Sequence, residues 1–317
     1  MLGAAHKPGA MPLRPLGLGD IYDAAFRIIR FNPKATVGSA VLVAAAGMSL
    51  PLLFAAVFTW TVGLSLEPTG SDFGTAELAG LIGFVSALVI GVVMQWIGTI
   101  LVTGMIAHVT AAAAIGRRLS LQEAWLATRG KRWRLIGTSL LIGLATAALF
   151  AAYVGLWVVV VVTSDTAAPV VIWGLLTVPV FICLTLWLWI RAAYLPVPAL
   201  MLEPVGILGA VGRGFGLSRH QFWRIFGIAL LTLLITGIAS QVLSTPVSLL
   251  GQFAVVSLGP EYEALGLIVV QALTSVLSAA FVTPFTGAVT ALQYLDQRIR
   301  KEAYDVELMT QAGITAS

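Results

Sequence analysis

The side chains that could support chemistry in this sequence are few and widely separated. The chain has three histidines and one cysteine: His6, His108, His220 and Cys183. Their spacing fits no metal-ligand pattern, and a single cysteine excludes an intramolecular disulfide. Neither a G-x-S-x-G nucleophile motif nor a G-x-x-x-x-G-K-[ST] phosphate loop occurs. We therefore expect no catalytic site, no bound metal and no cofactor.

A second group of polar side chains follows one apolar segment near residue 240. Hydroxyl groups recur at every fourth position, with a glutamine beside them: Thr232, Thr236, Ser240, Gln241, Ser244 and Ser248. This spacing places the hydroxyls on one face of a helix. Two interpretations are open. The hydroxyls bond to carbonyls of their own helix or to a neighbouring helix, or they line a polar groove that faces a lipid headgroup or a solute.

The composition indicates that the elements carrying these polar side chains are helices in a membrane. Of the 317 residues, 59% are hydrophobic and 10% are charged, and the mean hydropathy is +0.97. A soluble protein has about 25% charged residues. Six windows without Asp, Glu, Lys or Arg each exceed the roughly 20 residues that cross a bilayer as a helix. The sequence therefore predicts an all-α membrane protein with spans near 37–62, 80–106, 136–162, 168–190, 225–247 and 266–292.

The charged residues are divided between the two sides of this arrangement. All 18 basic residues lie in the N-terminal segment, the second and fourth connections and the C-terminal tail. The other three connections carry only acidic charges: Glu67, Asp72, Glu77, Asp165, Glu261 and Glu263. Lys and Arg remain on the cytoplasmic side of a membrane. We expect a multi-pass protein of the cell membrane with a flexible cytoplasmic N-terminal tail (1–16), a transmembrane domain (17–297) and a cytoplasmic C-terminal tail (298–317).

The segments before the first, third and fifth spans share a pattern. In each one an arginine lies eight residues before a glycine and four residues after an aromatic residue. These pairs are Phe26 and Arg30, Trp125 and Arg129, and Phe215 and Arg219. The pattern predicts three repeats, each an interfacial elbow helix on the cytoplasmic side followed by a pair of spans. The alternative is that aromatic and basic residues gather at the cytoplasmic boundary of any membrane protein.

Six charged residues are candidates for headgroup or elbow contacts: Arg30, Arg129, Arg219, Arg191, Arg213 and Glu203. Glu203 lies in an apolar stretch, where Arg191 or Arg213 could pair with it. Anionic lipids of the cytoplasmic leaflet attract such basic side chains. Membrane lipids are therefore the expected partners, together with a membrane protein. Nucleic acid is not expected, because the basic residues lie next to the spans and form no separate domain.

Three stretches resemble actinobacterial multi-spanning proteins of the glycerophosphoryl diester phosphodiesterase membrane domain family. They are PLRPLGLGDIYDAAFRIIRFNPKATVG, RAAYLPVPALMLEPVGILGAVGRGFGLSRHQFWRIFGI and YLDQRIRKEAYDVELM. The matching positions are Arg191, Glu203, Arg213, Ser218, Trp223, Asp296, Arg298, Arg300, Glu302 and Asp305. The family name comes from versions fused to a phosphodiesterase barrel, which needs roughly 250 residues. Because about 20 residues follow the last span, the resemblance implies a membrane domain without phosphodiesterase activity.

The sequence favours a non-enzymatic membrane scaffold or accessory protein for lipid or cell-envelope processes. This protein would act through its basic elbows and a groove bounded by the fifth span, which carries the hydroxyl groups. The alternative is a transporter or lipid-translocating protein that uses the hydroxyl face as a groove. A membrane enzyme is the least favoured class, because no catalytic motif accompanies the spans.

Overall fold

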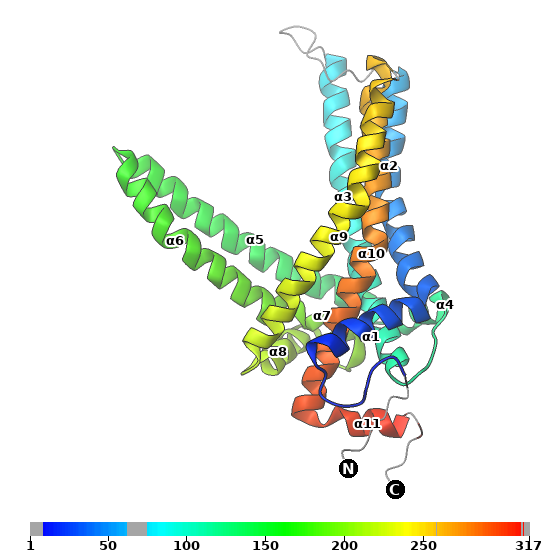
Figure 1. Ribbon diagram of the computed structural model, residues 1–317. Coiled ribbons are helices and arrows are strands. Elements are labelled where there is room, and N and C mark those ends of the chain that lie inside the picture. The colour runs from blue at the N-terminus through cyan, green and yellow to red at the C-terminus, as the bar shows by residue number, and fades with distance from the viewer. Residues whose placement is uncertain (1–8, 62–74, 258, 312, 314–317) are drawn as a thin grey trace.

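The computed structural model describes residues 9–61, 75–257, 259–311 and 313. In this part of the chain the regular elements are helices, and six are long and apolar enough to cross a membrane. The helices that contain the six spans are α2 (Ser39–Thr61), α3 (Thr75–Ala114), α5 (Arg132–Thr163), α6 (Ala167–Leu188), α9 (Phe222–Val256) and α10 (Pro260–Glu302). The prediction of an all-α protein with six apolar helices is confirmed (Figure 1).

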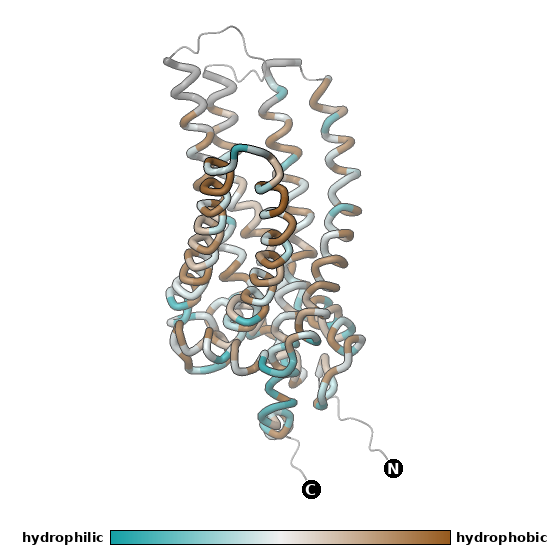
Figure 2. Tube along the Cα trace, turned by 90° about the vertical axis from the view of Figure 1, so that its left-hand side faces the viewer, coloured by the Kyte–Doolittle hydropathy of each residue, from teal (hydrophilic) through white to brown (hydrophobic). Residues whose placement is uncertain are grey.

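Shorter helices gather at one end of the molecule, together with the first and last described residues (Figure 1). They are α1 (Leu18–Phe31), α4 (Leu121–Ala127), α7 (Pro196–Leu202), α8 (Ile207–Ser218), α11 (Tyr304–Gln311) and the π-helices η1 (Lys34–Gly38) and η2 (Trp189–Tyr194). Hydrophilic residues are concentrated there, whereas hydrophobic residues predominate along the long helices (Figure 2). We call this region the charged end.

Four of the long helices form a bundle: α2, α3, α9 and α10. Glycines allow their backbones to approach closely, since a Cβ on Gly98 of α3 would collide with Val43 of α2. Gly251 of α9 has the same relation to Val270 of α10. Close approach through small residues is the usual way in which membrane helices pack, because lipid provides no hydrophobic drive between them.

The remaining pair, α5 and α6, forms a hairpin that diverges from the bundle (Figure 1). Within α5 only Leu135 and Thr138, near the charged end, are buried, and no residue of α6 is buried. The hairpin has internal packing, because the ring of Tyr153 stacks on Phe181 at 3.9 Å and its hydroxyl lies 3.0 Å from that of Thr177. At 1.5 Å per residue, the 32 residues of α5 extend about 48 Å and can cross a tilted path through a core of about 30 Å.

The structure describes most of the two segments predicted as tails, whose bounds stay predictions. Residues 1–8 lie outside the described residues, and Met11 and Leu16 are completely buried against the charged end. Beyond residue 298, α10 continues to Glu302 and is followed by α11, where Leu308 is buried. Both segments carry apolar side chains that the helices of the charged end cover, so neither is a free tail over its described residues.

A short helix precedes each of the three helix pairs, but the predicted aromatic–arginine pairs are only partly helical. Arg30 lies in the last turn of α1, whereas Arg129 follows the end of α4 and Arg219 follows the end of α8. The cation above the ring of Trp125 is Arg132, at 3.8 Å. A threefold repeat and a cytoplasmic location of these helices stay predictions.

The start of α4 agrees with its sequence signal. Ser120 Oγ accepts a hydrogen bond from the Glu123 amide at 3.2 Å, and the Glu123 carboxylate accepts one from the Ser120 amide at 2.8 Å. This reciprocal capping box satisfies two amides that the first turn leaves free. Pro33 follows the end of α1, where the chain passes from α1 into η1.

We expect the first turn of α4 to loosen at acidic pH. The Ser120 hydrogen bonds lower the pKa of Glu123 below its ordinary value, the backbone bond most strongly. A carboxylate with a lowered pKa stabilises the fold above its unfolded pKa, and this stabilisation is lost as the pH falls through the folded pKa. Amide hydrogen exchange at residues 121–124, corrected for intrinsic rates, should therefore accelerate on acidification, and Glu123→Gln should remove most of this pH dependence. Equal pH dependence in both proteins would contradict the assignment.

Candidate functional site

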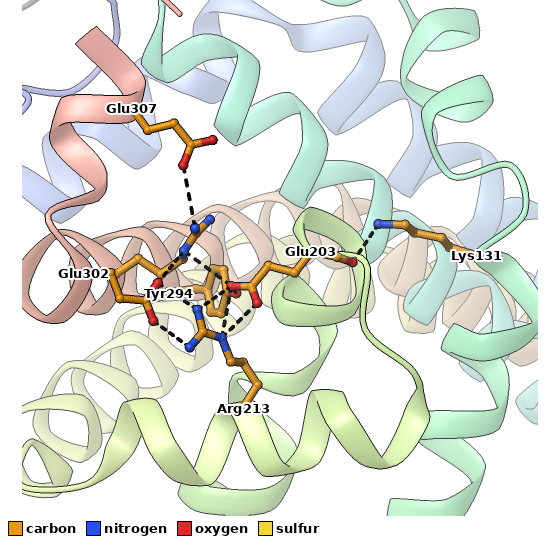
Figure 3. Close-up of polar contacts among 7 residues, drawn as sticks. Lys131, Glu203, Arg213, Tyr294, Glu302 and Glu307 are labelled. Atoms are coloured by element: carbon orange, nitrogen blue, oxygen red, sulfur yellow. Dashed lines mark hydrogen bonds and ion pairs between the residues drawn. The ribbon is translucent and has the colours of Figure 1, made fainter. Parts of the chain in front are cut away.

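A network of charged side chains centred on Glu203 joins several elements of the charged end (Figure 3). Arg213 of α8 donates three hydrogen bonds to the Glu203 carboxylate, at 2.8, 2.9 and 3.1 Å. Tyr294 of α10 also donates to this carboxylate, and Arg298 forms an ion pair with Glu203 at 3.3 Å. Glu302 completes the network by accepting hydrogen bonds from Arg213 at 2.7 Å and from Arg298 at 3.0 Å. We call these five residues the Glu203 network.

The Glu203 network resolves the alternatives left open for Glu203, because its partner is Arg213 rather than Arg191. Hydrogen bonding to Glu203 raises the pKa of Arg213 above its ordinary value, with further contributions from Glu302. Arg213 therefore stays charged, and it links α8 to the end of α10.

Lys131 links the start of α5 to the residues around Glu203 by hydrogen bonds. Its Nζ donates to the backbone carbonyl of Glu203 at 3.0 Å (Figure 3). It also donates to the backbone carbonyl of Met201 at 2.7 Å. Burial lowers the pKa of Lys131, and the charge of Arg134 lowers it further. The ammonium thus serves as a donor to carbonyls at the end of α7 and joins the hairpin to the rest of the charged end.

A second network is centred on Asp296 of α10, whose side chain is 1% exposed. Its carboxylate accepts hydrogen bonds from the Leu16 amide at 2.7 Å, from Arg224 at 3.0 Å and from Arg300 at 3.0 Å. Arg224 and Arg300 also donate to the Leu16 carbonyl. These residues form the Asp296 network, which attaches residues 9–16 to the start of α9 and to the end of α10.

Both networks join helices through hydrogen bonds and ion pairs within the protein, although the buried Nε of Arg224 has no hydrogen-bond partner among the described residues. Every carboxylate in them faces an arginine. Among the described residues, no group of three His, Cys, Asp or Glu side chains is placed to hold a metal ion.

The predicted headgroup residues do not form one site. The structure brings Glu203 and Arg213 together, while Arg30 lies in α1, Arg129 follows the end of α4 and Arg219 follows the end of α8. Arg191, in η2, lies 5.1 Å from the ring centroid of Trp187. Five residues of the two networks were not predicted as site residues: Tyr294, Arg298, Asp296, Arg224 and Arg300. The sequence does contain a pattern that indicates two of these contacts. Asp296 and Arg300, and likewise Arg298 and Glu302, are four residues apart, which is the spacing of ion pairs on a helix.

The hydroxyl face of α9 is directed mainly into the protein. Thr232 and Thr236 are buried and donate to carbonyls one turn earlier, and the Tyr22 hydroxyl lies 3.2 Å from that of Thr232. The Ser240 hydroxyl lies 2.6 Å from that of Ser278 on α10. Ser244 is buried, whereas Gln241 is exposed, and the Ser248 hydroxyl bonds to the carbonyl of Thr245. These contacts correspond to the packing interpretation of the face.

We expect Ser240→Leu to destabilise the bundle, because the larger side chain must displace Ser278 at the junction of α9 and α10. Overpacking of this kind costs about 1–3 kcal/mol. Thermal unfolding of the detergent-solubilised protein measures the effect. Val242→Leu is the matched control, because Val242 is 67% exposed on the same helix. A Ser240→Leu variant as stable as the wild type would indicate free space and favour the groove interpretation.

Described residues beside the charged end line at least two pockets. One, of about 520 Å³, is lined by Arg27, Arg30 and Phe31 of α1, by Arg118, and by Gly9, Ala10 and Gly116. We call it the arginine pocket. The other, of about 490 Å³, has apolar walls from α2 and α3 and is bordered by Leu121 and Trp125 of α4. We call it the apolar pocket.

Known proteins give no further guide to these features. Comparison of the chain with protein-family models, with curated proteins and with solved structures gives no match. The resemblance to the phosphodiesterase membrane domain family therefore stays an expectation. The features that the structure shows are six helices long and apolar enough to cross a membrane, a charged end and a diverging helix pair.

Proposed function

We propose that this chain is a non-enzymatic scaffold or accessory protein of the cell membrane that takes part in lipid or envelope processes. One observation carries the proposal: α5 and α6 leave the bundle and expose apolar side chains along most of their length. Lipid or the spans of a partner must cover such a surface in a bilayer. A helix pair fastened at one end and free along its sides is well suited to dock a membrane partner.

The apolar pocket supports the connection with lipids. Its walls include Leu42 and Val43 of α2 and Leu101, Val102 and Met105 of α3. Its volume is within the range of small-molecule pockets, about 300–1,000 Å³. An acyl chain of a lipid matches this lining, because it needs no hydrogen-bond partner.

Photo-crosslinking in native membranes tests the scaffold role. A photoreactive amino acid at Leu175 of α6, which is 72% exposed, should give a discrete protein adduct. The matched control is Val92 of α3, which is 68% exposed on the bundle and should give lipid adducts alone. Lipid adducts at both positions would contradict the scaffold role. A protein adduct that also forms at Val92 would show that the hairpin is not the docking surface.

We further propose that the charged end is cytoplasmic, because basic residues concentrate there and translocation of Lys and Arg is disfavoured. A periplasmic reporter fused after Ser317 should be inactive, whereas the same reporter inserted after Asp165, in the α5–α6 turn, should be active. The opposite pair of results would reverse the orientation.

The transporter or lipid-translocating role is the second candidate. The divergence of α5 and α6 from the bundle favours it. If the hairpin moved towards the bundle, it would change how easily a lipid or solute enters the space between them. Its predicted groove along α9 has little support, since Thr232, Thr236 and Ser240 already have hydrogen-bond partners. A disulfide that locks the hairpin to the bundle separates the candidates, because it should abolish lipid translocation in vesicles.

A further inference from the structure

The arginine pocket has an excess of positive charge that the described chain does not neutralise. Arg27 has a carboxylate partner, Asp23, at 2.9 Å. Within the described residues, Arg30 and Arg118 form no ion pair. Both are exposed, and both line the same pocket of about 520 Å³. Two guanidinium groups are thus directed at a space large enough for a small ligand.

The pocket is also built in advance of any ligand. The guanidinium of Arg118 lies over the ring of Phe31 at 4.3 Å, which fixes its position through a cation–π contact. The Asn32 side chain accepts a hydrogen bond from the Leu119 amide at 3.1 Å and joins the end of α1 to the residue after Arg118. A site whose parts are already held loses less entropy on binding.

The floor of the pocket is fixed by a close backbone contact. The Ala10 amide donates to the Ala113 carbonyl at 2.8 Å, at the end of α3. A Cβ at position 9 would collide with the Ala113 carbonyl and the Gly116 amide, so only glycine permits this approach. Met11, completely buried, anchors the segment on its far side. The floor therefore depends on contacts between residues about 100 positions apart in the sequence.

We propose that the arginine pocket binds a phosphomonoester group, carried either by a lipid headgroup or by a soluble compound. A guanidinium fork matches the geometry of phosphate oxygens and donates paired hydrogen bonds to them. A phosphomonoester carries a charge of about −1.5 to −2 at neutral pH, which balances Arg30 and Arg118. A phosphodiester carries one negative charge and leaves part of this excess uncompensated. The proposal is independent of the hairpin and goes beyond the scaffold function.

The test uses the purified full chain in nanodiscs of phosphatidylcholine. Native mass spectrometry measures retained lipid after addition of phosphatidic acid, a phosphomonoester, or phosphatidylglycerol, a phosphodiester. A separate titration adds glycerol 3-phosphate, a soluble phosphomonoester. We expect a phosphomonoester to bind at least tenfold more tightly than phosphatidylglycerol, and Arg30→Ala/Arg118→Ala to lose this preference. If phosphatidic acid binds and glycerol 3-phosphate does not displace it, the ligand is a lipid. If glycerol 3-phosphate displaces phosphatidic acid, the pocket accepts a soluble phosphomonoester. Either result supports a phosphomonoester site in the arginine pocket.

A matched control separates the pocket from general attraction of anions. Arg129→Ala/Arg219→Ala removes two exposed arginines of the charged end that lie outside the pocket. This variant should retain the preference for phosphomonoesters. Equal losses in the two double variants, or equal binding of phosphatidic acid and phosphatidylglycerol by the wild type, would overturn the proposal.

Arginine side chains also stabilise helix C-termini, so the experiment needs a variant in which charge is retained. Arg118→Lys keeps the charge but loses the planar fork, and it should weaken phosphomonoester binding while leaving the unfolding temperature of the ligand-free protein unchanged. Undiminished binding by Arg118→Lys together with undiminished binding by Arg30→Ala would exclude the pocket as the site.

Discussion

Replacing Asp296 with alanine should destabilise the protein more than removal of any exposed carboxylate. Its side chain is 1% exposed and accepts hydrogen bonds from Arg224, Arg300 and the Leu16 amide. Removing one partner of a buried ion pair costs about 3–5 kcal/mol, because the remaining charge is left uncompensated. The two arginines are nearly 30% exposed and partly solvated, so we expect the lower limit, about 3 kcal/mol. Thermal unfolding in detergent should show a decrease in the unfolding temperature of roughly 4–5 °C.

Two further variants serve as controls for the effect of Asp296→Ala. Glu307→Ala removes the same charge at the charged end, where the carboxylate is 57% exposed and 3.9 Å from Arg298, and it should cost less than about 1 kcal/mol. Asp296→Asn retains an acceptor for the Leu16 amide and should be intermediate. If Asp296→Ala and Glu307→Ala unfold at the same temperature, the Asp296 network contributes nothing measurable to stability.

The second large effect is expected at Glu203. In Glu203→Ala, Arg213 and Arg298 are left to share Glu302, and the buried Tyr294 hydroxyl loses its acceptor. An unsatisfied buried group adds about 1–3 kcal/mol to the cost of a broken ion pair. We expect a total destabilisation of about 3 kcal/mol, measured by thermal unfolding.

A double-mutant cycle identifies the cause of this effect. Arg213→Ala should also destabilise the protein, but Glu203→Ala/Arg213→Ala should cost less than the sum of the two single variants, since it removes both charges of one pair. The expected coupling energy is about 1–3 kcal/mol. Arg129→Ala combined with Glu203→Ala is the control, and its two effects should add. An additive result for Glu203 and Arg213 would show that their hydrogen bonds contribute little.

The six spans were predictable because a bilayer excludes charge and requires every backbone group to be paired within the helix. Long windows without charged residues are therefore sufficient to locate them. The ends were less predictable at the charged end, where helices continue into polar sequence. The α10 helix reaches Glu302 because pairs such as Asp296 with Arg300 have helical spacing and support further turns.

The networks and the divergence of the hairpin were not predictable from the sequence, for two different reasons. Asp296 binds a backbone amide 280 residues earlier in the chain, and no local pattern encodes such a contact. Side chains of the hairpin face lipid, whereas side chains inside the bundle face other helices, and these two environments are about equally apolar. Hydropathy therefore cannot distinguish Leu175, which is exposed, from Leu292, which is completely buried.

The divergence of α5 and α6 gives the molecule unequal cross-sections at its two ends. The helices meet at the charged end, and the hairpin and bundle separate away from it (Figure 1). Such a shape displaces different areas of lipid in the two leaflets of a bilayer. Bending the membrane expands one leaflet relative to the other, so the free energy of inserting this shape depends on the direction of curvature. From the shape of the fold we therefore expect insertion into flat and into curved membrane to differ in free energy.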